Sequence, residues 1–221
     1  MRPTALRLVL AASLLACSAA KATSSSFNAD AEGWTSEGNG NATVDWADGA
    51  ISMLDVTEGW AYLQAPDSYR APVAAGGSFS FDLRHEATGT QPRAYGVRVA
   101  LTSGSTTLIA EAAKPKADWL RYDFALAPSA GWRSFSDIQK RYEDTAPEAT
   151  LETLTTVLRT LTGVYIAADY TDANAFNGLG IDRTFIDNVQ LLAAPVPEAE
   201  PWAMLAAGLA ALGWLAKRRG A

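Results

Sequence analysis

Residues 78–84 read Ser-Phe-Ser-Phe-Asp-Leu-Arg, with hydrophobic and polar side chains in strict alternation. Successive side chains of a β-strand point to opposite faces, so Phe79, Phe81 and Leu83 share one face of an extended segment. Polar residues then occupy the other face, as in a strand of an antiparallel sheet that covers a core on one side only. This segment therefore predicts a half-buried strand.

Similar patterns recur along the middle of the chain, at residues 95–101, 106–110, 119–126, 163–168 and 184–192. Turn-forming Gly, Ser and Pro residues separate them. Antiparallel strands at this spacing predict an all-β sandwich. A single helix interrupts the series: Pro147 and Glu148 open it, and Gly163 ends it. An apolar stripe for core packing is expected along it, formed by Leu151, Leu154, Leu158 and Leu161.

Composition excludes several classes of protein. The 221 residues are 48% hydrophobic and 19% charged, which suits one domain with a buried core. One Cys and one His exclude a Cys/His zinc site and an internal disulfide. The net charge is −6 and the middle of the chain has no basic run, which argues against nucleic acid as a partner.

The N-terminus has the pattern of a secretory signal peptide, assigned to residues 1–22. Arg2 and Arg7 precede an apolar stretch that is too short to span a bilayer, and Ala20-Lys21-Ala22 is a small-x-small cleavage site. A second interpretation remains open, because Leu14-Leu15-Ala16-Cys17 resembles a lipobox that would place a lipid on Cys17.

The C-terminus, residues 196–221, carries an apolar run at 202–216 followed by Lys217-Arg218-Arg219. The run is expected to form a short transmembrane helix with its basic end in the cytoplasm; the alternative is a buried helix of the domain. The sorting motif is Val196-Pro197-Glu198, and the whole tail resembles the PEP-CTERM sorting signal of Gram-negative bacteria. Ala199 departs from that signal's second Pro. The resemblance implies processing by an exosortase, a membrane transpeptidase, and delivery to the outer surface or the exopolysaccharide matrix.

The remaining domain, residues 23–195, holds 12 Lys and Arg against 22 Asp and Glu, a net charge of −10. Trp60 and Tyr62, the following Ala-Pro-x-x-Tyr, the 76–84 segment and the Ile-Asp-Asn-Val at 186–189 resemble the laminin B (laminin IV type A) domain. The resemblance covers nearly all of 27–193. It implies a galactose-binding-like jelly roll, related in shape to many carbohydrate-binding modules.

In relatives of this shape a structural Ca²⁺ often joins the first and last strands, and its ligands come from the N-terminal lead-in and an aspartate near the C-terminus. The resemblance thus implies Asn28, Asp30 and Asp187 as metal ligands, with Glu32 close by. The other interpretation is that Asp187 only caps a turn. Calcium requires six to eight oxygen ligands, which backbone carbonyls help to supply.

Aromatic side chains are what a sugar-binding module uses, and Trp46 and Trp132 are expected at the surface as ligand-binding residues because each adjoins a turn. Catalysis is not expected: His85 reads as an exposed strand-end residue, and no Gly-x-Ser-x-Gly motif occurs.

The sequence predicts an exported, non-catalytic protein that binds or resides in extracellular polysaccharide, such as a biofilm matrix. It would be anchored briefly in the inner membrane before release to the cell surface. Two alternatives stay open, a structural matrix protein without a specific ligand and a polysaccharide hydrolase of unrecognised type.

Overall fold

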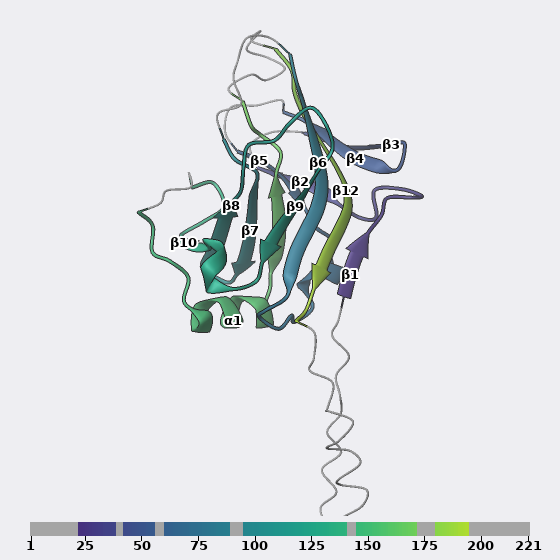
Figure 1. Cartoon of the computed structure of the whole chain (residues 1–221). Coiled ribbons are helices and arrows are strands. Elements are labelled where there is room, and N and C mark those ends of the chain that lie inside the picture. Colours follow the sequence, from purple (N-terminus) through teal and green to yellow (C-terminus); the bar gives the residue numbers. More distant parts are fainter. Residues whose placement is uncertain are drawn as a thin grey trace, which may run out of the picture.

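The computed structural model of the chain describes residues 22–38, 42–55, 60–88, 95–140, 145–171 and 180–194. Two antiparallel sheets face each other in a jelly-roll β-sandwich, with one α-helix (Figure 1). Residues 1–21 of the predicted signal peptide, the predicted Val196-Pro197-Glu198 motif and the 202–216 run lie outside these residues, whereas Ala22 belongs to β1. Within them, no helix has the length and hydrophobicity needed to cross a membrane.

The first sheet, as far as the structure describes it, has six strands. β12 lies in the middle, with β6 and then β9 on one side and β4 and then β3 on the other; β1 pairs with the C-terminal half of β12 beside β4. The bounds of these strands are Ala22–Ser25 (β1), Val44–Ala47 (β3), Ala50–Leu54 (β4), Ser78–Ala87 (β6), Leu120–Ala125 (β9) and Asp182–Leu192 (β12).

The second sheet also has six strands among the described residues, in the order β10-β8-β7-β11-β5-β2. Their bounds are Thr35–Gly38 (β2), Ala61–Gln64 (β5), Arg98–Ser103 (β7), Thr106–Glu111 (β8), Arg133–Phe135 (β10) and Gly163–Ala167 (β11). Two short 3₁₀ helices, Asp67–Arg70 and Pro128–Ala130, lie in connections.

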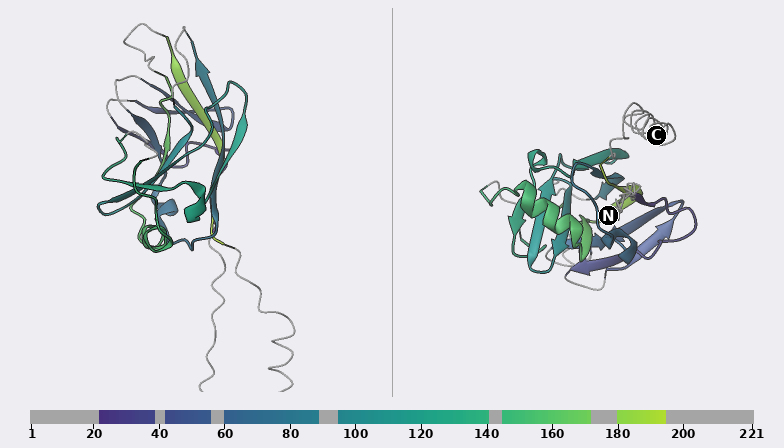
Figure 2. Two further views of the ribbon diagram at one scale, coloured as in Figure 1. Left: turned by 60° about the vertical axis from the view of Figure 1, so that its left-hand side comes forward. Right: turned by 90° about the horizontal axis from the view of Figure 1, so that it is seen from below.

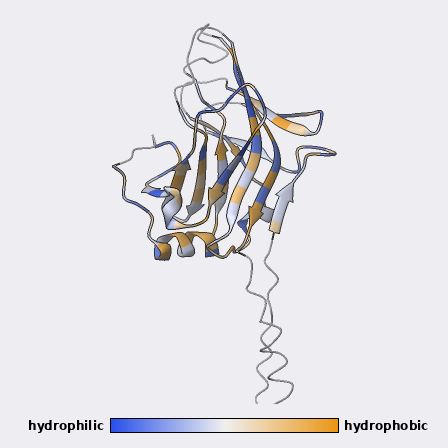
Figure 3. Ribbon diagram, in the orientation of Figure 1, coloured by the Kyte–Doolittle hydropathy of each residue, from blue (hydrophilic) through white to orange (hydrophobic). Residues whose placement is uncertain are grey.

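The core fills the space between the sheets. Phe79, Phe81 and Leu83 of β6 are fully buried there, as the alternation in the sequence predicted. Val99, Leu101, Val164 and Ile166 of the second sheet belong to the same buried cluster. The colouring by hydropathy in Figure 3 shows hydrophobic and polar residues alternating along the strands. The predicted strand at 95–101 is displaced in the structure to Arg98–Ser103, although Val97 before it still exchanges backbone hydrogen bonds with Ala112 and Ala113.

The helix α1 spans Leu151–Arg159 and lies across one open end of the sandwich (Figure 2). Thr150 is its N-cap, and its side-chain oxygen accepts a hydrogen bond from the Thr153 N–H. Leu154 and Leu158 are fully buried, which confirms most of the predicted stripe. The prediction was wrong for Leu151, which is 59% exposed because the first helical turn projects beyond the sheets.

Both ends of the described domain lie at one end of the sandwich. Ala22, the first residue of β1, pairs with Leu192, the last residue of β12. Figure 1 shows α1 at this same end. A segment attached at either terminus therefore joins the domain at the end that carries α1. The outer faces of the two sheets form the sides of the domain and do not lie at this end.

Candidate functional site

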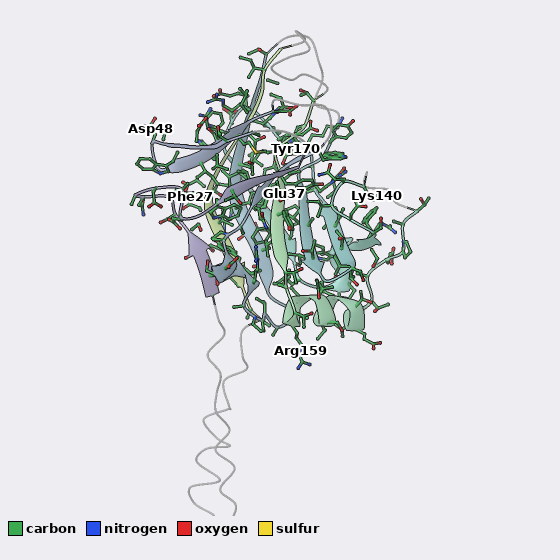
Figure 4. All side chains as sticks on the ribbon, turned by 180° about the vertical axis from the view of Figure 1, so that it is seen from behind. Phe27, Glu37, Asp48, Lys140, Arg159 and Tyr170 are labelled. Carbon is green, nitrogen blue, oxygen red and sulfur yellow. The ribbon has the colours of Figure 1, made fainter. Side chains whose placement is uncertain are left out.

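Four aromatic side chains gather on the side of the second sheet that faces away from the other sheet, and we call Trp60, Tyr62, Tyr95 and Tyr165 the aromatic patch. Tyr62 is fully buried, whereas the other three are half-buried. Tyr165 of β11 pairs with Gln64, and Ala167 pairs with Tyr62, so both tyrosines lie on the face opposite the core residues Val164 and Ile166. Trp60 precedes β5 and Tyr95 precedes β7; their ring centroids lie 4.6 Å apart. Figure 4 views the molecule from this side.

Tyr165 lies flat on the sheet, over Gly163. A Cβ atom added to Gly163 would lie 2.4 Å from the Tyr165 ring and hydroxyl, so only glycine leaves room for this orientation. The Tyr62 ring meets the Tyr165 ring nearly at right angles, with 6.2 Å between centroids. Tyr165 is half-buried, so part of the ring is open to solvent. A flat, partly exposed ring of this kind is a platform for the apolar face of a planar or pyranose ligand.

Polar side chains border this platform on both sides. The Thr35 hydroxyl lies 3.5 Å from the Gln64 side-chain oxygen on the β2 side. The hydroxyls of Thr102 and Thr162 are 3.2 Å apart on the β7 side. Glu37, labelled in Figure 4, is exposed on β2, opposite Tyr62. Donors and acceptors therefore surround an aromatic surface, as in sites that bind and orient hydroxylated ligands.

A buried arginine fixes the other end of the aromatic patch. The Arg98 guanidinium lies 3.8 Å from the Trp60 ring centroid and donates to Glu111 at 3.0 Å and to the Lys140 carbonyl at 3.2 Å. Arg98 is 1% exposed, so this stacked pair is held firmly. The indole of Trp60 contacts both Arg98 and Tyr95 and remains half-buried.

The segment 136–140 crosses outside this end of the patch. The Tyr62 hydroxyl donates to the Ile138 carbonyl at 2.6 Å, and the Gln139 side-chain amide donates to the Trp60 carbonyl at 3.3 Å. Burial raises the pKa of Tyr62 to about 12, although the neighbouring Arg98 acts in the opposite direction. Tyr62 therefore stays protonated at neutral pH and keeps donating to Ile138.

The two tryptophans chosen from the sequence lie elsewhere. Trp132 is fully buried, and its indole N–H donates to the Ala125 carbonyl at 2.8 Å, so the prediction of a surface position was wrong. The turn at Gly131 directs its ring inward, against Phe124. Trp46 is 43% exposed as expected, and its indole N–H donates to the Phe27 carbonyl at 2.6 Å. It lies on β3, at the edge of the first sheet, whereas the aromatic patch is on the second.

The exposure predicted for His85 was also wrong. It is fully buried on β6, and its Nε2 lies 2.6 Å from the Asp182 carboxylate, which is buried as well. The expectation of an exposed histidine was wrong because position 85 continues the inward-facing series of β6, and Asp182 on the adjacent β12 provides a polar partner inside the core.

The residues that the sequence implied as calcium ligands lie in the N-terminal lead-in and on β12, where they make local hydrogen bonds. Asp30 accepts the backbone N–H of Glu32, the Asn28 amide donates to Ser26, and Asp187 accepts from Asn188. Among the described residues, no group of three or more His, Cys, Asp or Glu is placed to hold a metal. Burial raises the pKa of the Asp187 carboxyl, and Glu32 of the lead-in lies near enough to add to this effect; the calcium site at Asn28, Asp30 and Asp187 stays a prediction.

The chain resembles several solved structures at low sequence identity. The L4b domain of human laminin alpha-2 is 14% identical, with a TM-score of 0.52, and the alignment covers 73% of this chain and 90% of that domain. A family 11 carbohydrate-binding module from Clostridium thermocellum, complexed with a β-1,3-1,4-mixed-linked tetrasaccharide, is 15% identical (TM-score 0.47; 80% and 97% covered). A family 29 module complexed with mannohexaose is 15% identical (TM-score 0.45; 79% and 93% covered).

The likeness to the laminin domain confirms the laminin-like jelly-roll fold that the sequence predicted. No protein-family model matches the chain, and no curated protein matches it. Function therefore has to be argued from the site itself.

The sequence alone indicates part of the aromatic patch. Trp60 and Tyr62 are two residues apart, which places them on one face of an extended segment. Nothing local links them to Tyr165 or Arg98, because these residues come from strands that are adjacent only in the folded sheet.

Proposed function

We propose that this chain is an exported, non-catalytic protein that binds extracellular polysaccharide through the aromatic patch on the outer face of the second sheet. The carrying observation is the Tyr165 ring, which lies flat over Gly163 among the hydroxyl and amide groups of Thr102, Thr35 and Gln64. The C–H face of a pyranose packs on such a ring, and its hydroxyls exchange hydrogen bonds with the border.

Two of the solved structures that the chain resembles are carbohydrate-binding modules in complex with oligosaccharides. Their likeness is too distant to transfer a ligand, so the proposal depends on the patch. His85, the single histidine of the chain, is buried in the core and is not available to a Ser-His-Asp triad, which supports the non-catalytic proposal for histidine-dependent chemistry alone. A histidine without access to solvent does not act as a general base on a polymer.

Export and surface sorting follow from the two ends of the sequence. We infer that the signal peptide directs secretion and that an exosortase removes the tail after Val196-Pro197-Glu198, releasing the domain into the polysaccharide matrix. The geometry supports this proposal, because both chain ends leave the sandwich beside α1 and an anchor there keeps the aromatic patch clear of the membrane.

Affinity electrophoresis tests the binding proposal. The full chain, kept in solution by a mild detergent, is run through gels that contain mixed-linked β-glucan or mannan, two neutral polysaccharides. We expect retardation of the wild type and weaker binding of Tyr165→Ala by about tenfold, equivalent to about 1.4 kcal/mol. Tyr165→Phe keeps the ring and should bind normally.

Gly163→Ala is the second arm of this test. Its new Cβ would collide with the Tyr165 ring, so it should weaken binding without removing any aromatic residue. Leu151→Ala is the matched control, because Leu151 is exposed on α1 and away from the patch. The proposal is wrong if the wild type is not retarded, or if Tyr165→Ala and Gly163→Ala bind as the wild type does.

A further inference from the structure

A second ligand-binding arrangement lies on the opposite side of the molecule, on the outer face of the first sheet. Trp119, Arg84 and Phe185 form a row across the neighbouring strands β9, β6 and β12. Phe185 pairs directly with Arg84, and Trp119 lies beside Arg84 because the next residues, Leu120 and Leu83, are paired. The Arg84 guanidinium lies 3.7 Å from the Phe185 ring centroid and 5.5 Å from that of Trp119.

This row is not part of the hydrophobic core. It lies on the face opposite Leu83 and Tyr122, and Trp119 is 43% exposed. Of the four large hydrophobic side chains that are most exposed in the described part of the chain, two lie on this face, Trp119 and Ile181. Arg84 is held by its ion pair with Glu86, so its guanidinium is positioned before any ligand arrives.

A row of hydrogen-bonding groups runs beside the aromatic row, one step along the strands. Arg121 donates to Asp82 at 3.3 Å, to Ser80 at 2.6 Å and to the Asn188 carbonyl at 2.8 Å. The Asn188 amide donates to Asp82 at 2.8 Å. Side by side, the two rows offer stacking surfaces and fixed polar groups on an open sheet.

The form and charge of this surface favour a neutral polysaccharide as its occupant. Trp119 and Phe185 are two strands apart, about 10 Å, which is close to the length of a disaccharide. The apolar part is a narrow row flanked by charged groups, whereas a stable protein interface needs a broad patch of roughly 1,000 Å² in total. Arg84, Arg121 and Arg183 are balanced on this face by acidic residues, and the acidic domain as a whole repels polyanions.

We propose that the Trp119–Arg84–Phe185 row is a second polysaccharide-binding surface, and that the protein cross-links two polysaccharide chains, one on each outer face of the sandwich. This inference rests on the proposed function, which assigns the first surface to the aromatic patch. The two sheets face outward in opposite directions, so a single extended polymer does not reach both surfaces. Bivalent attachment lets one protein join two chains of a matrix.

The test compares four forms of the full chain in mild detergent: wild type, Tyr165→Ala, Trp119→Ala and the double variant. Each is mixed with mixed-linked β-glucan or mannan; binding is measured by affinity electrophoresis and cross-linking by turbidity and viscosity. We expect the wild type to bind and cross-link. Tyr165→Ala should bind about tenfold more weakly, through the remaining surface, and Trp119→Ala should keep the binding of the aromatic patch. Both single variants should lose cross-linking, and the double variant should bind more weakly than either of them. Trp119→Phe keeps an aromatic ring at this position and should cross-link as the wild type does, unlike Trp119→Ala.

The outcomes separate the two proposals. If Tyr165→Ala abolishes binding and Trp119→Ala still cross-links as the wild type does, the first surface is right and the second is overturned. If Trp119→Ala abolishes binding and Tyr165→Ala has no effect, the aromatic patch is not the site and cross-linking by two faces is wrong. A wild type that binds neither polysaccharide overturns both.

Discussion

The buried carboxylate of Asp182 provides the sharpest test of how this fold is held together. Its Oδ1 lies 2.6 Å from His85 Nε2, while its Oδ2 accepts from the N–H groups of Tyr170 and Thr171 at 3.0 and 2.7 Å and from the Thr171 hydroxyl at 2.9 Å. One side chain of β12 thus ties β6 to the segment that follows β11. Asp182→Ala removes all of these contacts at once.

The expected cost follows from burial. Asp182 and His85 are both fully buried, so the donors that lose this acceptor cannot turn to water. Removing one partner of a buried pair typically costs about 3–5 kcal/mol. Because domains are stable by only about 5–15 kcal/mol, Asp182→Ala should lose a large share of the total. Asp182→Asn keeps one acceptor oxygen and should fall between Asp182→Ala and the wild type.

Urea unfolding of the described domain, residues 22–194, followed by tryptophan fluorescence, measures this cost. Thr184→Val is the matched control on the same strand, since it removes a single hydrogen bond, to the Ala168 carbonyl, and should cost about 1 kcal/mol. The reasoning is refuted if Asp182→Ala unfolds within about 1 kcal/mol of the wild type.

Two further predictions concern the helix and the Asp187 loop. Leu158→Ala should cost about 2–5 kcal/mol because Leu158 is fully buried, whereas Leu151→Ala should stay within about 0.5 kcal/mol; equal urea midpoints would contradict the packing of α1. Burial raises the pKa of Asp187, with Asp82 and Glu32 adding to the effect against the Asn188 N–H. A raised folded-state pKa favours the protonated carboxyl, so this group's contribution to stability is complete below the unfolded pKa and is lost as the pH rises through the folded value. The free energy of unfolding of Asp187→Asn should therefore exceed that of the wild type at pH 7 by about 0.5 kcal/mol or less, and this difference should shrink in acid. Melting with Ca²⁺ or EDTA belongs to the same experiment: a rise with Ca²⁺ that Asp187→Ala abolishes would support the calcium site implied by the sequence, and no change with either would refute it.

Local pattern in the sequence determined the elements of the sandwich. Alternation at 78–84 predicted a strand with its core face correctly assigned, and the pattern at 119–126 predicted a second strand. The leucine spacing predicted the helix, although α1 begins at Leu151 and not near Pro147. These features depend on side-chain direction along one segment, which the period of the backbone fixes without reference to the rest of the chain.

Only the tertiary structure decided which side chains face solvent and which distant residues meet. Trp132 and Trp119 each lie beside a polar or turn segment, yet Trp132 packs against Phe124 in the core while Trp119 lies open beside Arg84. His85 and Asp182 are 97 positions apart, and no local pattern joins them. The physical reason is that a strand's period shows which residues share a face, whereas the pairing of strands and the segments that cross them determine what that face touches.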